Sequence, residues 1–158
     1  MKKEFFDCLL KEMKKNKDIY MIFIDLGWPR VDEFLHAFPD RAITVGAAEQ
    51  TALDIAVGLA YESKVPFVYT ITPFLFRGFE TIRTYINHEK LNVKMIGAGR
   101  DEDYSWDHGF SHDAKDVKKT FDLFENIVQI WPDNKDQMED VVKTIIKDPN
   151  PNFLSLGR

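Results

Sequence analysis

The sequence predicts an α/β fold: a doubly wound, mostly parallel sheet of about six strands with helices on both faces. Two observations support this prediction. Short apolar runs recur along the chain without alternating polar positions, which is typical of strands buried on both faces of a parallel sheet. Segments of helical period lie between these runs, so strand and helix alternate from one end to the other.

The elements follow in order along the chain. A first amphipathic helix is expected because five apolar side chains recur at helical spacing between lysines: Phe5, Phe6, Leu9, Leu10 and Met13. The apolar runs predict six strands, at residues 19–24, 42–45, 67–71, 93–96, 127–131 and 153–156. Three further helical faces lie among them, formed by Ala52, Ile55, Ala56 and Leu59, by Ala114, Val117, Phe121 and Phe124, and by Met138, Val141, Val142 and Ile145.

Chain punctuation supports the last two helices. Asp113 and Asp133 stand where side chains that cap helix N-termini are expected. The segment 148–151, Asp-Pro-Asn-Pro, then ends the last helix and leads into the final strand.

Composition narrows the class of protein. The 158 residues suit one domain, and a net charge of −5 with a pI near 5.4 argues against a nucleic-acid partner. The lysines near the start are interrupted by apolar residues and favour a solvated helix face. A single cysteine, Cys8, fits a reducing cytoplasm, and no apolar run reaches the ~18 residues that span a bilayer. We therefore expect a cytoplasmic protein with no membrane segment.

Two parts of the sequence contain candidate catalytic or binding residues. Glu49 follows a predicted strand and opens a helix whose early residues are small, although the helix dipole alone accounts for many such glutamates. The segment 97–112 is polar, aromatic and glycine-containing, and it follows another predicted strand. Ligands of open α/β sheets bind beyond the carboxyl ends of strands, so this loop is a functional candidate.

Two motifs carry a family resemblance. Gly46-Ala47-Ala48-Glu49-Gln50, preceded by Asp40-Arg41, and the Phe-rich segment 72–79 resemble the pyrimidine-binding domain of transketolase-type thiamine diphosphate enzymes. The resemblance extends over residues 1–158 and implies a single pyrimidine-binding domain, similar to the C-terminal-type subunit of a split transketolase. It implies thiamine diphosphate as cofactor.

The resemblance implies a role for each matching residue near the cofactor. Glu49 is expected to be catalytic, by hydrogen-bonding a nitrogen of the cofactor's pyrimidine ring and sharing its proton. Phe74 is expected to stack on that ring, with Phe79 as a second ring or as plain core. Arg77 matches an arginine of the deoxyxylulose-phosphate synthase branch near the active site, although an exposed, ion-paired arginine is equally plausible.

Asp25-Leu26, after the first predicted strand, resembles an Asp-Leu pair that borders the cofactor in the family. A strand-end aspartate that satisfies loop amides is an equally good interpretation.

The segment 107–112 resembles the family's Asp-Gly-x-Thr-His, with Ser111 in place of the threonine and His112 in place of a histidine that contacts substrate or the aminopyrimidine. His112 is therefore a second catalytic candidate, and Asp107 and His108 are expected near the substrate; His108 either intrudes after Asp107 or replaces it. A metal site built from these residues with neighbouring aspartates is disfavoured, because their spacing is not that of a zinc site.

The family's diphosphate motif, Gly-Asp-Gly, does not occur, and Gly97-Ala98-Gly99-Arg100 lacks the carboxylate. The resemblance therefore implies a separate diphosphate-binding subunit that holds Mg²⁺, a heterotetramer of two such pairs, and transfer of a two-carbon ketol unit between sugar phosphates or modified sugars.

Three alternatives stay open. The first is decarboxylating condensation in the synthase manner, weakened by Ile71 where that branch usually has tyrosine. The second is a partner-binding or regulatory domain that has lost its chemistry. The third is a flavodoxin-like binder, which ranks last because the turn at residues 25–29 offers one glycine and a proline that lacks a donor.

Overall fold

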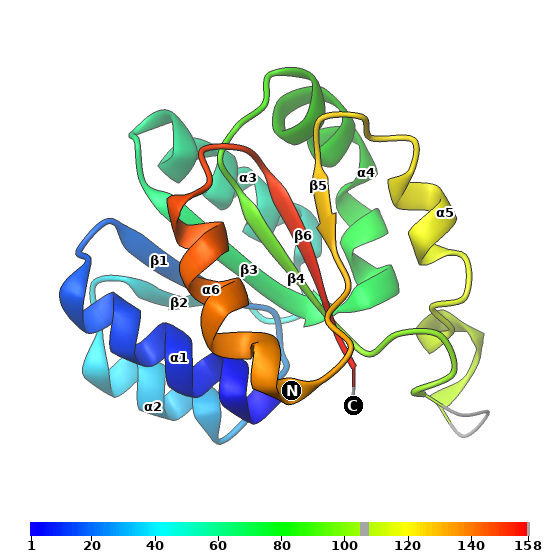
Figure 1. Cartoon of the computed structure of the whole chain (residues 1–158). Coiled ribbons are helices and arrows are strands. Elements are labelled where there is room, and N and C mark those ends of the chain that lie inside the picture. Colours follow the sequence, from blue (N-terminus) through cyan, green and yellow to red (C-terminus); the bar gives the residue numbers. More distant parts are fainter. Residues whose placement is uncertain (105–107, 158) are drawn as a thin grey trace.

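The sheet is wholly parallel in the part of the chain that the computed structural model describes, residues 1–104 and 108–157 (Figure 1). Its strands are β1 (Ile19–Phe23), β2 (Ala42–Thr44), β3 (Val65–Ile71), β4 (Lys94–Ala98), β5 (Val128–Ile130) and β6 (Asn152–Leu156). They lie in the order β2-β1-β3-β4-β6-β5, and every neighbouring pair is parallel. The predicted doubly wound α/β fold is confirmed, with each of the six strands at its expected place.

Helices cover both faces of the sheet. They are α1 (Lys2–Lys15), α2 (Arg30–Ala37), α3 (Glu49–Tyr61), α4 (Phe79–Thr81), α5 (Val117–Phe121) and α6 (Met138–Lys147). Shorter turns are the 3₁₀ segments η1 (Thr72–Gly78), η4 (Phe110–His112) and η5 (Lys135–Gln137) and the π-helical segment η2 (Ile82–His88). Helices α1, α2 and α6 lie on one face, and α3, α4 and α5 lie on the other (Figure 1). Within the described ranges, no helix is long and apolar enough to cross a membrane.

The apolar side chains of the strands pack into two cores, one on each face of the sheet. Along β1 and the residue after it, Met21 and Phe23 face the core under α1, α2 and α6, whereas Ile22 and Ile24 face the core under α3 and α5. All four side chains are at most 3% exposed. Burial on both faces is the physical reason that the strand sequence does not alternate.

Aromatic side chains pack between α5 and the sheet. The rings of Phe121 and Phe153 stack with centroids 3.9 Å apart and an interplanar angle of 8°. Trp131 meets Phe153 edge to face at 5.5 Å. These contacts join α5, the residue that follows β5, and β6 on one face of the sheet, so Phe153 is a central contributor to stability.

Local details differ from the predictions. Helix α5 spans five residues, less than the pattern from Ala114 to Phe124, because Ala114 forms an isolated bridge with Asp101 and the chain turns again after Phe121, although the four apolar side chains of that pattern are buried. Asn134, rather than the expected Asp133, forms the capping box that precedes α6.

Two further corrections concern helices α5 and α2. The Asp113 carboxylate accepts a hydrogen bond from the Lys115 amide at 3.0 Å, so it shapes a turn before α5 and does not cap the helix. Helix α2 was not expected from the sequence. It buries only Val31 and Phe34 along its length, which is too few positions to establish a helical period.

A buried lysine, Lys94, forms hydrogen bonds at the edge of the sheet where β4 and β6 begin. The Lys94 side chain is fully buried, and its amino group donates to the carbonyls of Asp148 and Asn150 at 2.7 and 2.8 Å and to the Asn152 side chain at 2.5 Å. The bonds hold the segment that enters β6 against the first residue of β4.

This lysine makes stability depend on pH. Burial lowers the pKa of the Lys94 amino group from 10.5 to about 7, opposed by the Asp148 carboxylate. Between these values the unfolded chain binds more protons than the folded chain, so the free energy of unfolding is expected to rise with pH, by up to about 1.4 kcal/mol per pH unit. Chemical denaturation between about pH 7.5 and 9 measures this slope. Cys8 near the upper limit, and Tyr69 at still higher pH, oppose the rise, because burial raises the pKa of both groups and their ionisation favours unfolding.

The matched control separates Lys94 from surface groups. Lys94→Met is expected to flatten the slope, whereas Lys143→Met, at an exposed ion-paired lysine, is expected to leave it unchanged. A slope retained in Lys94→Met contradicts the assignment.

Candidate functional site

The candidate residues gather at the carboxyl edge of the sheet. Glu49 opens α3 soon after β2, η1 begins directly after β3, and the segment that contains η4 follows β4. The Thr72 hydroxyl at the start of η1 donates to the carbonyl of Gly99 after β4. This bond joins two of the segments, and the edge they form is where open α/β sheets bind ligands.

Glu49 is a buried carboxylate that forms an ion pair with Arg77. Its side chain is 4% exposed, and its Oε1 accepts a hydrogen bond from Arg77 Nη1 at 2.5 Å. The Arg77 side chain reaches it from η1 and is 50% exposed. The arginine therefore balances the charge of the carboxylate from the solvent side.

Phe74 contacts Arg77, and His112 contacts Phe74. The guanidinium carbon of Arg77 lies 4.0 Å from the centre of the Phe74 ring, and the His112 ring meets Phe74 edge to face at 5.0 Å. The structure thus brings four of the candidate residues together, and we call Glu49, Arg77, Phe74 and His112 the Glu49 cluster.

The loop after β4 adds a second aromatic group to the Glu49 cluster. The Tyr104 ring contacts His112 at 5.5 Å and His108 at 5.3 Å, and the two histidine rings lie 5.7 Å apart. Gly99 permits this arrangement, because it has a φ of +84° and a Cβ there would lie 2.2 Å from Tyr104. Asp107, the remaining residue predicted in this loop, lies outside the described residues.

Tyr104 was not predicted as a site residue from the sequence. The only signal for it was that an aromatic residue stands within the polar, glycine-containing segment 97–112.

Three candidates are not part of the Glu49 cluster. Asp25 is exposed, with a left-handed φ of 37°, and Leu26 packs against the core under α1 and α2. Phe79 contacts Phe124 at 5.3 Å and is 37% exposed, so its ring belongs to the surface between α4 and α5. Their predicted roles beside a cofactor stay predictions.

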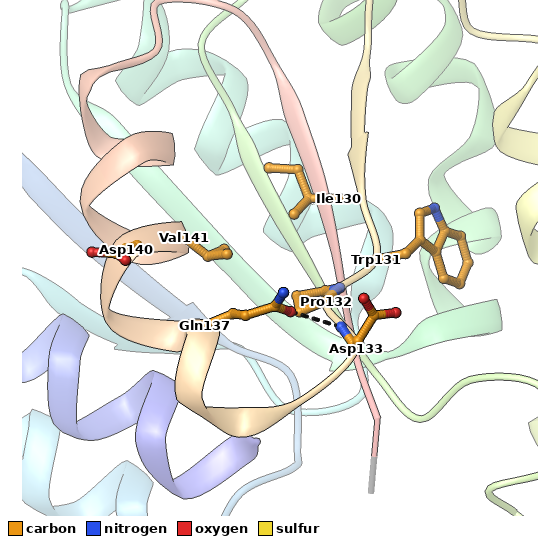
Figure 2. Close-up of a pocket in the computed structure, with 7 residues that line it drawn as sticks. All are labelled: Ile130, Trp131, Pro132, Asp133, Gln137, Asp140 and Val141. Carbon is orange, nitrogen blue, oxygen red and sulfur yellow. Dashed lines mark hydrogen bonds between the residues drawn. The ribbon is translucent and has the colours of Figure 1, made fainter.

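A separate hollow of about 360 Å³ lies between β5 and α6 (Figure 2). It borders the edge strand β5, whereas Glu49 follows β2 at the other edge of the sheet. Its carboxylates, Asp133 and Asp140, are exposed, and the Gln137 side chain already accepts a hydrogen bond from the Asp133 amide at 2.8 Å. The seven residues that line this hollow therefore offer no buried, unpaired polar side chain to select a ligand.

Side chains suited to a metal ion do not gather in the described residues. Among residues 1–104 and 108–157, no group of three or more His, Cys, Asp and Glu side chains is placed to hold a metal ion.

Fold and site together define a class: an open parallel α/β domain that presents a buried carboxylate and an aromatic ring at the carboxyl edge of its sheet. The family model for the transketolase pyrimidine-binding domain matches residues 1–158. The chain therefore belongs to the transketolase pyrimidine-binding domain family, as the sequence motifs indicated.

Individual relatives support the same placement. The chain is 27% identical, over 99% of its length and 51% of the relative, to one subunit of an apulose-4-phosphate transketolase from Phocaeicola vulgatus. It is 37% identical, over 58% of its length and 15% of the relative, to a 1-deoxy-D-xylulose-5-phosphate synthase from Mycobacterium bovis. A solved split-gene transketolase, described as an inactive beta4 tetramer, matches 99% of this chain and 51% of that chain with a TM-score of 0.86 and 28% identity. The chain thus spans about half the length of the apulose-4-phosphate transketolase subunit and of the split-gene transketolase.

Proposed function

We propose that residues 1–158 form the pyrimidine-binding domain of a split, thiamine diphosphate-dependent transketolase-like enzyme. The observation that carries this proposal is the buried Glu49 carboxylate at the carboxyl edge of the sheet, beside the Phe74 ring. A carboxylate that is 4% exposed and already accepts a hydrogen bond from a planar donor over an aromatic face fits an aminopyrimidine well.

The residues of this chain have distinct parts in the proposed reaction. When bound, thiamine diphosphate supplies the nucleophilic carbon that takes up the two-carbon unit. Glu49 holds a proton at the pyrimidine ring nitrogen, and burial keeps water from competing for that hydrogen bond. Phe74 covers one face of the ring, a contact that contributes ~0.5–1.5 kcal/mol beyond burial. His112 and His108 contact the substrate, and the resemblance assigns Asp107 to the substrate as well.

A second polypeptide completes the site in this proposal. The sequence lacks the Gly-Asp-Gly motif, so we assign the diphosphate and its Mg²⁺ to a separate subunit. Two such pairs form a heterotetramer in the cytoplasm. Support comes from the relatives, one of which is a single subunit of a transketolase and one of which is a split-gene enzyme.

The proposed reaction is transfer of a ketol unit between sugar phosphates or modified sugars. The apulose-4-phosphate enzyme supports this choice, since its match extends over nearly all of this chain. Decarboxylating condensation is the second candidate, and Arg77 favours it because it matches the synthase branch. The match to a synthase extends over only 58% of the chain.

Reconstitution tests the proposal. We expect the complex of this chain with a diphosphate-domain subunit to bind thiamine diphosphate with Mg²⁺ roughly a hundredfold or more tighter than either chain alone, because each holds only part of the cofactor. Titration calorimetry measures binding, and a coupled assay with ketose donors and aldose acceptors measures transfer. Release of carbon dioxide from a 2-oxo acid donor would instead favour the second candidate.

Two outcomes contradict the split site. One is tight cofactor binding by this chain alone, and the other is a stable complex that binds no cofactor.

A further inference from the structure

Arg77 lies between the two groups that the proposed function assigns to the pyrimidine ring. Its Nη1 donates to Glu49 Oε1 at 2.5 Å, and its guanidinium carbon lies 4.0 Å from the centre of the Phe74 ring. The guanidinium is a flat group of N–H donors. It therefore makes the two contacts, one to the carboxylate and one to the aromatic face, that an aminopyrimidine requires there.

The ion pair of Arg77 with Glu49 offsets the cost of burying a charged carboxylate. A carboxylate that is 4% exposed is costly to keep charged without a partner, and Arg77 supplies that partner. Arg77 bonds only Oε1 of Glu49, but its guanidinium lies 4.0 Å from the centre of the Phe74 ring and takes up the face on which a stacked pyrimidine would lie. Guanidinium and pyrimidine are alternative occupants of one place.

We propose that Arg77 is a placeholder, which occupies the pyrimidine position in the free chain and leaves Glu49 when the cofactor binds. This inference rests on the proposed function of the Glu49 cluster. It adds that cofactor binding competes with an internal ion pair, so the affinity of the site is set partly by Arg77.

The surroundings allow the side chain to move while the backbone stays in place. Arg77 is 50% exposed, so its guanidinium can turn into solvent at little cost. The next residue, Gly78, is buried directly against α3, and a Cβ there would lie 2.3 Å from Leu53 Cδ1. Close packing at Gly78 holds η1 on α3, which confines the rearrangement to the Arg77 side chain.

Cofactor affinity of the reconstituted complex tests the placeholder. Arg77→Ala removes the competing donor, and we expect the dissociation constant for thiamine diphosphate to fall by up to about fivefold, the scale of a partly exposed ion pair. Arg77→Lys keeps the charge but not the flat fork, and is expected to lie between wild type and Arg77→Ala. Arg83→Ala, which breaks an exposed ion pair with Glu80 farther along the chain, is the matched control and should leave affinity unchanged.

The outcomes distinguish this inference from the proposed function. If wild-type complex binds the cofactor and Arg77→Ala binds it equally or more weakly, the placeholder is overturned while the proposed function stands. If wild-type complex binds no cofactor, both are overturned. Tighter binding by Arg77→Ala, with Arg83→Ala unchanged, supports the placeholder.

Unfolding of the isolated chain gives a readout that is independent of the cofactor. A double-mutant cycle with Glu49→Gln, Arg77→Ala and the double variant measures the coupling between the two side chains. We expect Arg77→Ala to lower the melting temperature in the wild-type background and to have a smaller effect in the Glu49→Gln background. Additive effects overturn the placeholder, because the ion pair then does not hold the free chain.

Discussion

Glu49→Gln is expected to lower the turnover of the reconstituted complex by at least about 10²–10⁴-fold, the range typical of lost general acid–base help. The amide has nearly the size of the carboxyl group but cannot hold and return a proton. Because the Glu49 side chain is 4% exposed and lies at the first residue of α3, the substitution changes chemistry at a fixed place in the fold. Steady-state kinetics of ketol transfer at saturating cofactor measure the effect.

A matched variant controls for loss of an ion-paired carboxylate. Glu80→Gln removes an exposed carboxylate that pairs with Arg83, and turnover should stay at the wild-type level. Full activity in Glu49→Gln would remove this residue from the mechanism.

Phe153→Ala is expected to lower the free energy of unfolding by about 3–5 kcal/mol, the range found when a buried ring is removed from a core. Phe153 is fully buried on β6, stacks on Phe121 at 3.9 Å and meets the edge of Trp131 at 5.5 Å. Its loss leaves a cavity among rings that come from three separate segments. Urea denaturation followed by circular dichroism provides the measurement.

The control for the aromatic core is Leu123, which lies two residues after the end of α5. Leu123 is 68% exposed, and Leu123→Ala is expected to change stability by less than about 0.5 kcal/mol. If Phe153→Ala loses no more than this control, the stacked rings do not support the fold in the way proposed.

The strands were predictable because their physical cause is visible in the sequence. A strand that faces two cores, such as β1 with Met21 on one side and Ile22 on the other, must be apolar throughout. Helix α2 carries too few buried side chains to show a period, so it was missed. The sequence predicted Asp133 as the cap, whereas Asn134 forms it. Both residue types suit a capping box with Gln137, so the sequence alone did not distinguish them.

The site was predictable in part. Parallel topology places segments that follow β2, β3 and β4 at one edge, and this is why Glu49, Phe74 and His112 lie together. The motifs alone did not indicate that Arg77 bridges Glu49 and Phe74. That contact depends on the tight turn of η1, and the contact of Tyr104 with His112 depends on the backbone at Gly99.

The Lys94 anchor has a consequence for how such a domain diversifies. Its bonds to the segment entering β6 lie at the amino ends of β4 and β6, opposite to the loops that carry the Glu49 cluster. Substitutions in the loops of the Glu49 cluster therefore do not touch these bonds, which hold the segment entering β6 against β4. When the stabilising bonds and the functional loops lie at opposite edges of the sheet, the loops can change in sequence without loss of fold stability.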